Sequence, residues 1–173
     1  MKQILTPVKS KDIKDLKIGE EILLTGIIYT ARDAAHKKLI QLINEGKPLP
    51  FNLMGAAIYY SGPCPAPRGY PIGPCGPTTS YRMDEYSPQL LDLGLKIMIG
   101  KGKRGEGVNE SIKKNTAIYL AATGGAAALY MNCVKSSEII AFSELGAEAI
   151  RKLEVVDFPL IVATSSEGQS IYK

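Results

Sequence analysis

Short apolar runs alternate with segments of helical periodicity along this chain, and the alternation predicts its secondary structure. Residues 22–29 form an apolar run that indicates a buried strand, and residues 31–44 repeat with helical spacing before a stop at Gly46. The run at 56–60 predicts the next strand. The same reasoning predicts helices ending near residue 94, over 108–114 and from residue 124, and strands over 95–99, 117–122, 138–142, 160–164 and 169–172.

These strands are apolar along their length, as expected for a sheet that is covered on both faces. Strands that alternate with helices predict an α/β fold. A chain of 173 residues, 45% of them hydrophobic, is the right size to build one core. We therefore expect a single domain over residues 1–173.

Charge and hydropathy exclude several classes of protein. The net charge of +4 is mild and its lysines are spread out, so no nucleic-acid partner is indicated. No run approaches the roughly 20 apolar residues of a membrane span, and the N-terminus lacks the features of a secretory signal. The sequence predicts a cytoplasmic protein without a membrane partner.

Residues 61–77 are rich in proline and glycine and predict a long loop between two regular elements. Loops of this length in a compact domain are usually functional. Whether this loop moves is left open by the sequence.

The three cysteines are Cys64, Cys75 and Cys133. An odd number without a Cys-x-x-Cys pair argues against a zinc ribbon or a disulfide framework. The alternative is that the three thiols hold an iron–sulfur cluster with one iron left open. Cys133, however, lies in an apolar segment that predicts a buried helix, where a free cysteine acts as a small hydrophobic residue.

The run from Gly76 to Asp84 reads Gly-Pro-Thr-Thr-Ser-Tyr-Arg-Met-Asp and is the first candidate for a binding site. Arg82 carries a planar fork of donors that matches a carboxylate, and Thr78 lies on the same face if the segment is helical. The alternative is an ordinary helix start, with proline in the first turn and a threonine hydroxyl as the cap.

Two further basic residues follow predicted strands. Arg32 comes after the first strand and Lys101 directly after the strand at 95–99. Ligands of open α/β sheets collect at the carboxyl ends of strands, so we expect Arg32 and Arg82 to converge on an anion, with Lys101 as a further charge. His36, the only histidine, and Asp33 are expected to support this site, and no metal site is predicted in this chain.

The glycine-rich stretch from Gly100 to Gly105 matches neither a Walker phosphate loop nor Gly-x-Gly-x-x-Gly. Its backbone amides are nevertheless suited to binding an anion. A phosphate- or nucleotide-binding module is therefore the alternative function from a different class.

Five motifs together carry a resemblance to a known family. They are Arg-Asp-Ala-Ala-His-Lys, Gly-Pro-Thr-Thr-x-x-Arg-Met-Asp, Met-Ile-Gly-Lys, Gly-Gly-Ala-Ala and Phe-Ser-Glu-Leu-Gly-Ala-Glu-Ala-Ile. In this order they resemble the C-terminal domain of class I iron–sulfur fumarate hydratases, from about Gly19 to the C-terminus. Where that domain is a separate chain, it is the beta subunit of a fumarate hydratase or of the similar L(+)-tartrate dehydratase.

The resemblance implies a swivelling β/β/α domain and a partner alpha subunit that holds a four-iron four-sulfur cluster through its own three cysteines. It implies a site between the two subunits, where fumarate is reversibly hydrated to L-malate or, in the alternative, tartrate is dehydrated to oxaloacetate. Onto this chain it carries Arg32, Arg82 and Lys101 as carboxylate clamps and Thr78 as the catalytic base. Cluster ligation is not carried onto Cys64 or Cys75, which match no ligand motif of the family.

Overall fold

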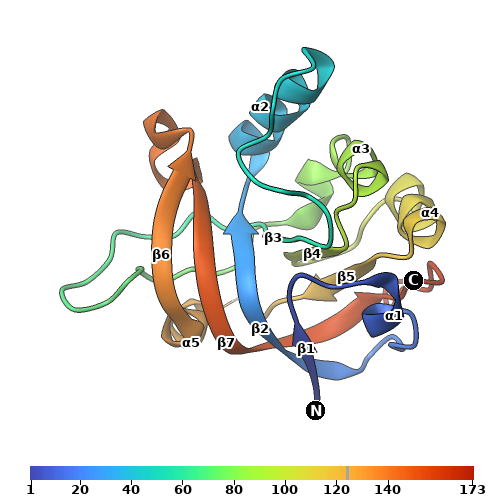
Figure 1. The fold of residues 1–173 in the computed structure, drawn as a ribbon. Coiled ribbons are helices and arrows are strands. Elements are labelled where there is room, and N and C mark those ends of the chain that lie inside the picture. The colour runs from blue at the N-terminus through green and yellow to red at the C-terminus, as the bar shows by residue number, and fades with distance from the viewer. Residues whose placement is uncertain (124) are drawn as a thin grey trace.

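The computed structural model describes residues 1–123 and 125–173, and its centre is a closed barrel of mixed strands (Figure 1). The barrel strands are β2 (Glu21–Thr30), β3 (Ala57–Tyr59), β4 (Ile97–Gly100), β5 (Ile118–Ala121) and β7 (Ile150–Thr164). Neighbours from β2 to β5 are parallel, and β7 closes the barrel by pairing antiparallel with both β5 and β2. Outside it, β1 (Lys2–Leu5) lies along β2, and β6 (Val134–Ala141) lies along β7.

The predicted α/β class is confirmed, but closure of the sheet into a barrel was not predicted from the sequence. The difference arises from β7, which is 15 residues long, whereas the sequence predicted a strand over 160–164 only. Its extra length lets one strand pair with β5 near its end and with β2 and β6 along the rest. The swivelling β/β/α arrangement remains a prediction.

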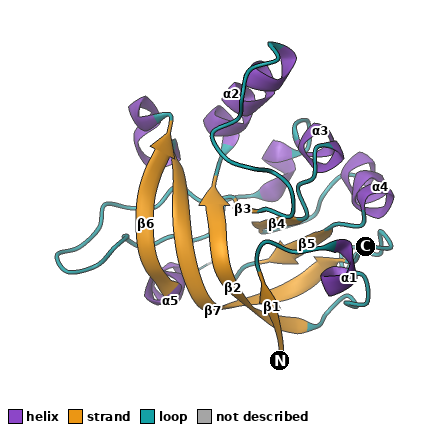
Figure 2. Cartoon of the chain, viewed as in Figure 1, coloured by secondary structure: helices purple, strands orange, loops and turns teal. Residues whose placement is uncertain are grey.

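The helices gather mainly on one side of the barrel, as Figure 2 shows for α2 (Asp33–Asn44), α3 (Ser87–Asp92) and α4 (Glu106–Asn115). Shorter elements are α1 (Ser10–Ile13), α5 (Ala127–Cys133) and the 3-10 segments η1 (Ser80–Met83) and η2 (Ser143–Glu148). Within the described residues, no helix has the length and apolar character needed to cross a membrane.

The core has two parts because successive side chains of a strand point to opposite faces. In β4, Ile97 and Ile99 belong to the cluster that joins the barrel strands to β1 and α1, whereas Met98 belongs to the cluster beneath α2, α3 and α4. Tyr59 and Tyr60 divide in the same way. The prediction of strands covered on both faces is confirmed for β3, β4 and β5, but it is wrong for β6, which is largely exposed, and β2 alternates between buried and half-buried positions.

Several predicted elements differ from the observed ones. The helix expected to end near residue 94 is divided into η1 and α3, and no strand forms over 169–172, where only an isolated bridge joins Thr164 to Ser170. The helix expected from residue 124, which lies outside the described residues, begins at Ala127. Cys133 is the last residue of that helix and is half-buried rather than in the core. The elements β1, α1 and η2 were not predicted.

The segment from Thr78 to Ser80 fits between the ends of β3 and β4. The backbone N–H of Thr78 donates to the Tyr60 carbonyl (2.7 Å), and that of Ser80 donates to the Lys101 carbonyl (2.9 Å). A Cβ on Gly100 would overlap the Ser80 hydroxyl and come within 2.7 Å of the Tyr60 ring. Only glycine at position 100 allows this close approach.

We expect Gly100→Ala to lower the free energy of unfolding by about 1–3 kcal/mol, the usual cost of inserting a methyl group into a packed site. Gly107→Ala is the matched control, because a Cβ on Gly107 meets no atom within 4 Å. Within α4 that change should raise stability by up to about 1 kcal/mol. Urea unfolding measures both variants, and equal stabilities would contradict the packing argument.

Candidate active site

The sequence-predicted site residues come together at one end of the barrel. Parallel pairing of β2, β3 and β4 places the carboxyl ends of these strands side by side. Arg32 follows β2, Lys101 follows β4, and the segment carrying Thr78 is bonded to the residue after β3. The convergence expected at strand ends therefore also holds in a closed barrel.

Thr78 lies outside any helix, next to the extended residue Thr79, which rules out both helical interpretations of it. The 3-10 segment η1 begins at Ser80, and its N-cap residue is Thr79, which makes no side-chain capping bond. Thr78 is therefore neither a helix cap nor on one helical face with Arg82. Its side chain is half-buried, and no hydrogen bond to its hydroxyl is found among the described residues. The hydroxyl is therefore available for chemistry, while the backbone N–H holds the residue in place.

Arg82 and Asp33 form a direct contact between η1 and the first turn of α2. Arg82 Nε donates to Asp33 Oδ2 at 2.8 Å, and the two side chains are 48% and 34% exposed. This bond uses one edge of the guanidinium and leaves its terminal nitrogens for another acceptor. Asp33 Oδ1 is shielded from solvent and has no partner in the described chain.

Arg32 is the residue that precedes α2, and its side chain is half-buried. Its Nε lies 4.0 Å from Glu148 Oε1, which is beyond hydrogen-bond distance but within that of an ion pair. Neither atom has a hydrogen-bond partner among the described residues, and both are shielded from solvent. The sequence did not predict a role for Glu148, although it lies in the motif Phe-Ser-Glu-Leu-Gly-Ala-Glu-Ala-Ile, which resembles the family.

Lys101 is exposed and forms an isolated parallel bridge with Thr79. The bridge fixes its backbone beside the segment that carries Thr78. The lysine stem is long and flexible, so its ammonium group can reach toward that segment as a point charge.

His36 is fully buried and supports Arg32 through the backbone. Its Nδ1 donates to the Arg32 carbonyl at 2.8 Å, which leaves Nε2 as the unprotonated nitrogen of the neutral ring. The ring packs against Tyr60 and Tyr86, and burial lowers its pKa to about 4. His36 is therefore a neutral, buried residue that holds the Arg32 backbone, and its supporting role at the site stays a prediction.

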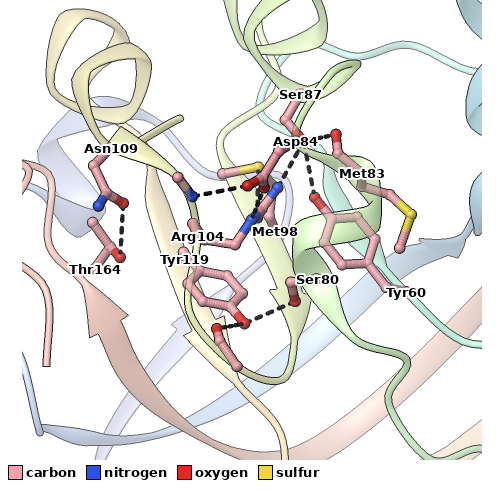
Figure 3. Close-up of polar contacts among 12 residues, drawn as sticks. Tyr60, Ser80, Met83, Asp84, Ser87, Met98, Arg104, Asn109, Tyr119 and Thr164 are labelled. Atoms are coloured by element: carbon pink, nitrogen blue, oxygen red, sulfur yellow. Dashed lines mark hydrogen bonds and ion pairs between the residues drawn. The ribbon is translucent and has the colours of Figure 1, made fainter. Parts of the chain in front are cut away.

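Arg104 is the largest feature that sequence reasoning missed. It is only 1% exposed, and its Nε donates to Asp84 Oδ1 at 2.7 Å while Nη2 donates to the Ser87 hydroxyl at 2.8 Å (Figure 3). Its guanidinium carbon lies 5.2 Å from the ring centre of Tyr60 and 5.0 Å from that of Tyr119, so both rings make cation–π contacts. The only sequence signal was an arginine in a glycine-rich stretch after a strand.

The glycine-rich stretch from Gly100 to Gly105 is used internally. The Gly105 N–H donates to Asp84 Oδ2 at 2.8 Å, and the Gly102 carbonyl accepts from the Tyr119 hydroxyl at 2.8 Å. The Gly105 N–H is thus already bonded to a carboxylate of the chain itself. No observation favours the alternative of a phosphate-binding module.

The 61–77 loop is closed at its base by bonds between its two arms. The Ser61 hydroxyl donates to the Gly76 carbonyl at 2.9 Å, and the Cys64 N–H donates to the Pro74 carbonyl at 3.0 Å. Beyond these bonds the loop extends away from the barrel on the left of Figure 1. It therefore begins and ends at the candidate site.

The three thiols are free and differ in surroundings. Cys64 is exposed, Cys133 is half-buried, and burial raises the pKa of Cys75 to about 12. Across residues 1–123 and 125–173, no three His, Cys, Asp or Glu side chains are grouped to hold a metal ion.

Removal of the Arg104 charge should destabilise the fold. Arg104→Met leaves the Asp84 carboxylate without its cation, and we expect a loss of about 3 kcal/mol, as for other broken buried pairs. Arg104→Lys should restore little, because an ammonium cannot reproduce the fork of bonds. The exposed neighbour Lys103 provides the control, Lys103→Met. Urea unfolding that gives both methionine variants the same stability would refute this role.

The buried His36 should make stability depend on pH. Its folded-state pKa of about 4 lies below the ordinary 6.5, so the unfolded chain binds more protons between these values and stability falls as pH falls. Between pH 7 and pH 5 the wild type should lose about 2 kcal/mol more than His36→Phe, whose other titrating groups are the same. Parallel stability profiles of the two proteins would contradict this.

Comparison with known proteins adds independent evidence. A family model described as fumarase C-terminus matches residues 2–173. The class I anaerobic fumarate hydratase of Escherichia coli K12 is 40% identical over 175 residues, which cover 100% of this chain but 31% of that protein. This chain thus spans about a third of the length of the fumarate hydratases that it matches.

Two relatives are of similar length to this chain. The putative L(+)-tartrate dehydratase subunit beta of Methanocaldococcus jannaschii is 39% identical over 179 residues, covering 100% of this chain and 92% of the relative. The L(+)-tartrate dehydratase subunit beta of Escherichia coli K12 is 35% identical over 177 residues, covering 99% and 87%.

Proposed function

This chain belongs to the fumarase C-terminus family, and we propose that it acts as the beta subunit of a class I iron–sulfur hydro-lyase that reversibly hydrates fumarate to L-malate. The family resemblance inferred from the motifs is confirmed over the whole chain. The swivelling β/β/α architecture and a cytoplasmic location are part of the same proposal.

The observation that carries the proposal is the convergence of Arg32, Arg82, Lys101 and Thr78 at one end of the barrel. A dicarboxylate needs two sites of positive charge, and a guanidinium matches a carboxylate with two parallel bonds. Arg32 and Arg82 are each oriented from one side by a carboxylate of the chain, Glu148 and Asp33. This arrangement leaves nitrogen atoms of both arginines for the substrate.

In this proposal, Thr78 moves the proton on the substrate carbon. Addition of water across a double bond places a proton on one carbon and a hydroxyl on the next. Binding of a carboxylate by Arg32 or Arg82 withdraws charge from it and makes the proton on the adjacent carbon more acidic. A threonine hydroxyl is a weak base, so Arg82 and Lys101 would stabilise its alkoxide.

The cluster belongs to the partner in this proposal, because the thiols of this chain do not fit one. Cys64, Cys75 and Cys133 differ in exposure and lie in no metal-binding group of the described residues. Relatives named subunit beta imply a second subunit, and the single-chain relatives are about three times longer than this chain. We infer that an alpha subunit holds the four-iron four-sulfur cluster and completes the site.

A tartrate dehydratase is the second candidate, because the relatives that match this chain along most of their length carry that name. Tartrate differs from malate by one hydroxyl on the same dicarboxylate frame. The carboxylate clamps are therefore the same in both candidates. The assembled enzyme should be assayed anaerobically with fumarate, L-malate and L(+)-tartrate, and the highest kcat/KM decides the substrate.

Thr78→Ala in the assembled enzyme should lower kcat by about 10²–10⁴-fold while substrate affinity and folding persist, as for loss of one proton-transfer group. Exchange of the substrate carbon-bound proton with solvent should fall in parallel. Thr79→Ala is the matched control, since its side chain makes no capping bond and the two residues are adjacent. A Thr78→Ala enzyme that keeps wild-type kcat would assign the base to the partner.

A further inference from the structure

The 3-10 segment η2, which precedes β7, lies against the start of α2. The hydroxyl of Thr30, the last residue of β2, donates to the Ala149 carbonyl (3.4 Å) and accepts from the Arg151 N–H (3.1 Å). Arg151 Nη1 also donates to the Ala147 carbonyl at 3.2 Å. These bonds fix the end of η2, and with it Glu148, beside the residue that precedes α2.

Glu148 faces the Nε edge of Arg32. The 4.0 Å between Glu148 Oε1 and Arg32 Nε joins two atoms that are shielded from solvent and have no other partner in the described residues. The side chains as a whole are 34% and 27% exposed. A cation and an anion in this partly buried setting attract each other more strongly than they would in water.

Gly62 bounds Arg32 on another side. A Cβ on Gly62 would lie 3.2 Å from both Cδ and Nη1 of Arg32 and 3.3 Å from the Ala147 carbonyl. The start of the 61–77 loop and η2 therefore both limit how the Arg32 side chain can turn. The surrounding backbone therefore restricts the conformations that the Arg32 side chain can adopt.

We propose that Glu148 is a positioning residue for Arg32. It holds the guanidinium at Nε and leaves terminal nitrogen atoms to bind a substrate carboxylate. The inference rests on the proposed function of Arg32 as a clamp. It also gives a role to Glu148 within the motif Phe-Ser-Glu-Leu-Gly-Ala-Glu-Ala-Ile, for which the sequence supplied none.

The test is a double-mutant cycle in the enzyme assembled with its alpha subunit. Glu148→Gln should raise KM for the dicarboxylate about 10-fold with kcat near wild type, an effect within the range measured between contacting residues. Arg32→Ala should raise KM at least as much. Because Glu148 acts through Arg32, the double variant should be no worse than Arg32→Ala alone.

Glu144→Gln is the matched control within η2, because Glu144 pairs with Lys38 at 2.8 Å on the exposed surface. It should leave KM and kcat unchanged. Glu148→Asp keeps the charge and should lie between wild type and Glu148→Gln. A misfolded variant lowers kcat because less of the enzyme is active, whereas a lost contact raises KM. The melting temperature of each variant shows which of the two has occurred.

The outcomes separate this inference from the function on which it rests. If Arg32→Ala raises KM but Glu148→Gln behaves as wild type, or adds fully to Arg32→Ala, the positioning role is wrong and the clamp stands. If Arg32→Ala leaves KM unchanged, the clamp itself is wrong, and the role of Glu148 falls with it.

Discussion

The buried guanidinium of Arg104 is the interaction on which the geometry of this end of the barrel depends. It bonds to Asp84 and Ser87 and lies between the rings of Tyr60 and Tyr119, so it links the stretch after β4 to the turn after η1. A charge removed from water is tolerated only when its donors are matched and its counterion stays in place. Because Arg104 can stay buried only while these bonds are intact, they fix the stretch after β4 relative to the turn after η1.

Fixing these segments also places the candidate site. Arg82 lies two residues before Asp84, and Lys101 lies three residues before Arg104, so both flank the buried pair. The Ser80 hydroxyl hydrogen-bonds to Tyr119, whose ring makes a cation–π contact with Arg104. Ser80 can pack this closely because Gly100 has no side chain. The proposed clamps and base are thus supported by neighbours that take no part in the proposed chemistry. Side chains held in this way lose little freedom on binding a substrate.

Much of the fold could be predicted because local patterns determine it. The apolar runs that became β3, β4 and β5 are buried on both faces, the run that became β2 alternates between buried and half-buried positions, and the gathering of Arg32 and Lys101 follows from parallel strand ends. Closure of the barrel could not be predicted, because β7 includes Asp157 and Pro159, which interrupt its apolar pattern. Arg104 and Glu148 were missed because their partners are distant in sequence, and no local pattern marks a tertiary ion pair. The helical conformation predicted at Thr78 is wrong, since a Gly-Pro-Thr-Thr run is equally compatible with a helix start and a non-helical segment.

A crystal structure of the assembled enzyme with succinate, a dicarboxylate that cannot undergo hydration, would test the account of the site. We expect the two carboxylates to lie within hydrogen-bond distance of Arg32 and Arg82, with a methylene carbon facing the Thr78 hydroxyl and Lys101 nearby. Succinate bound away from this end of the barrel, or held by the alpha subunit alone, would contradict the conclusion that this chain supplies the clamps and the base.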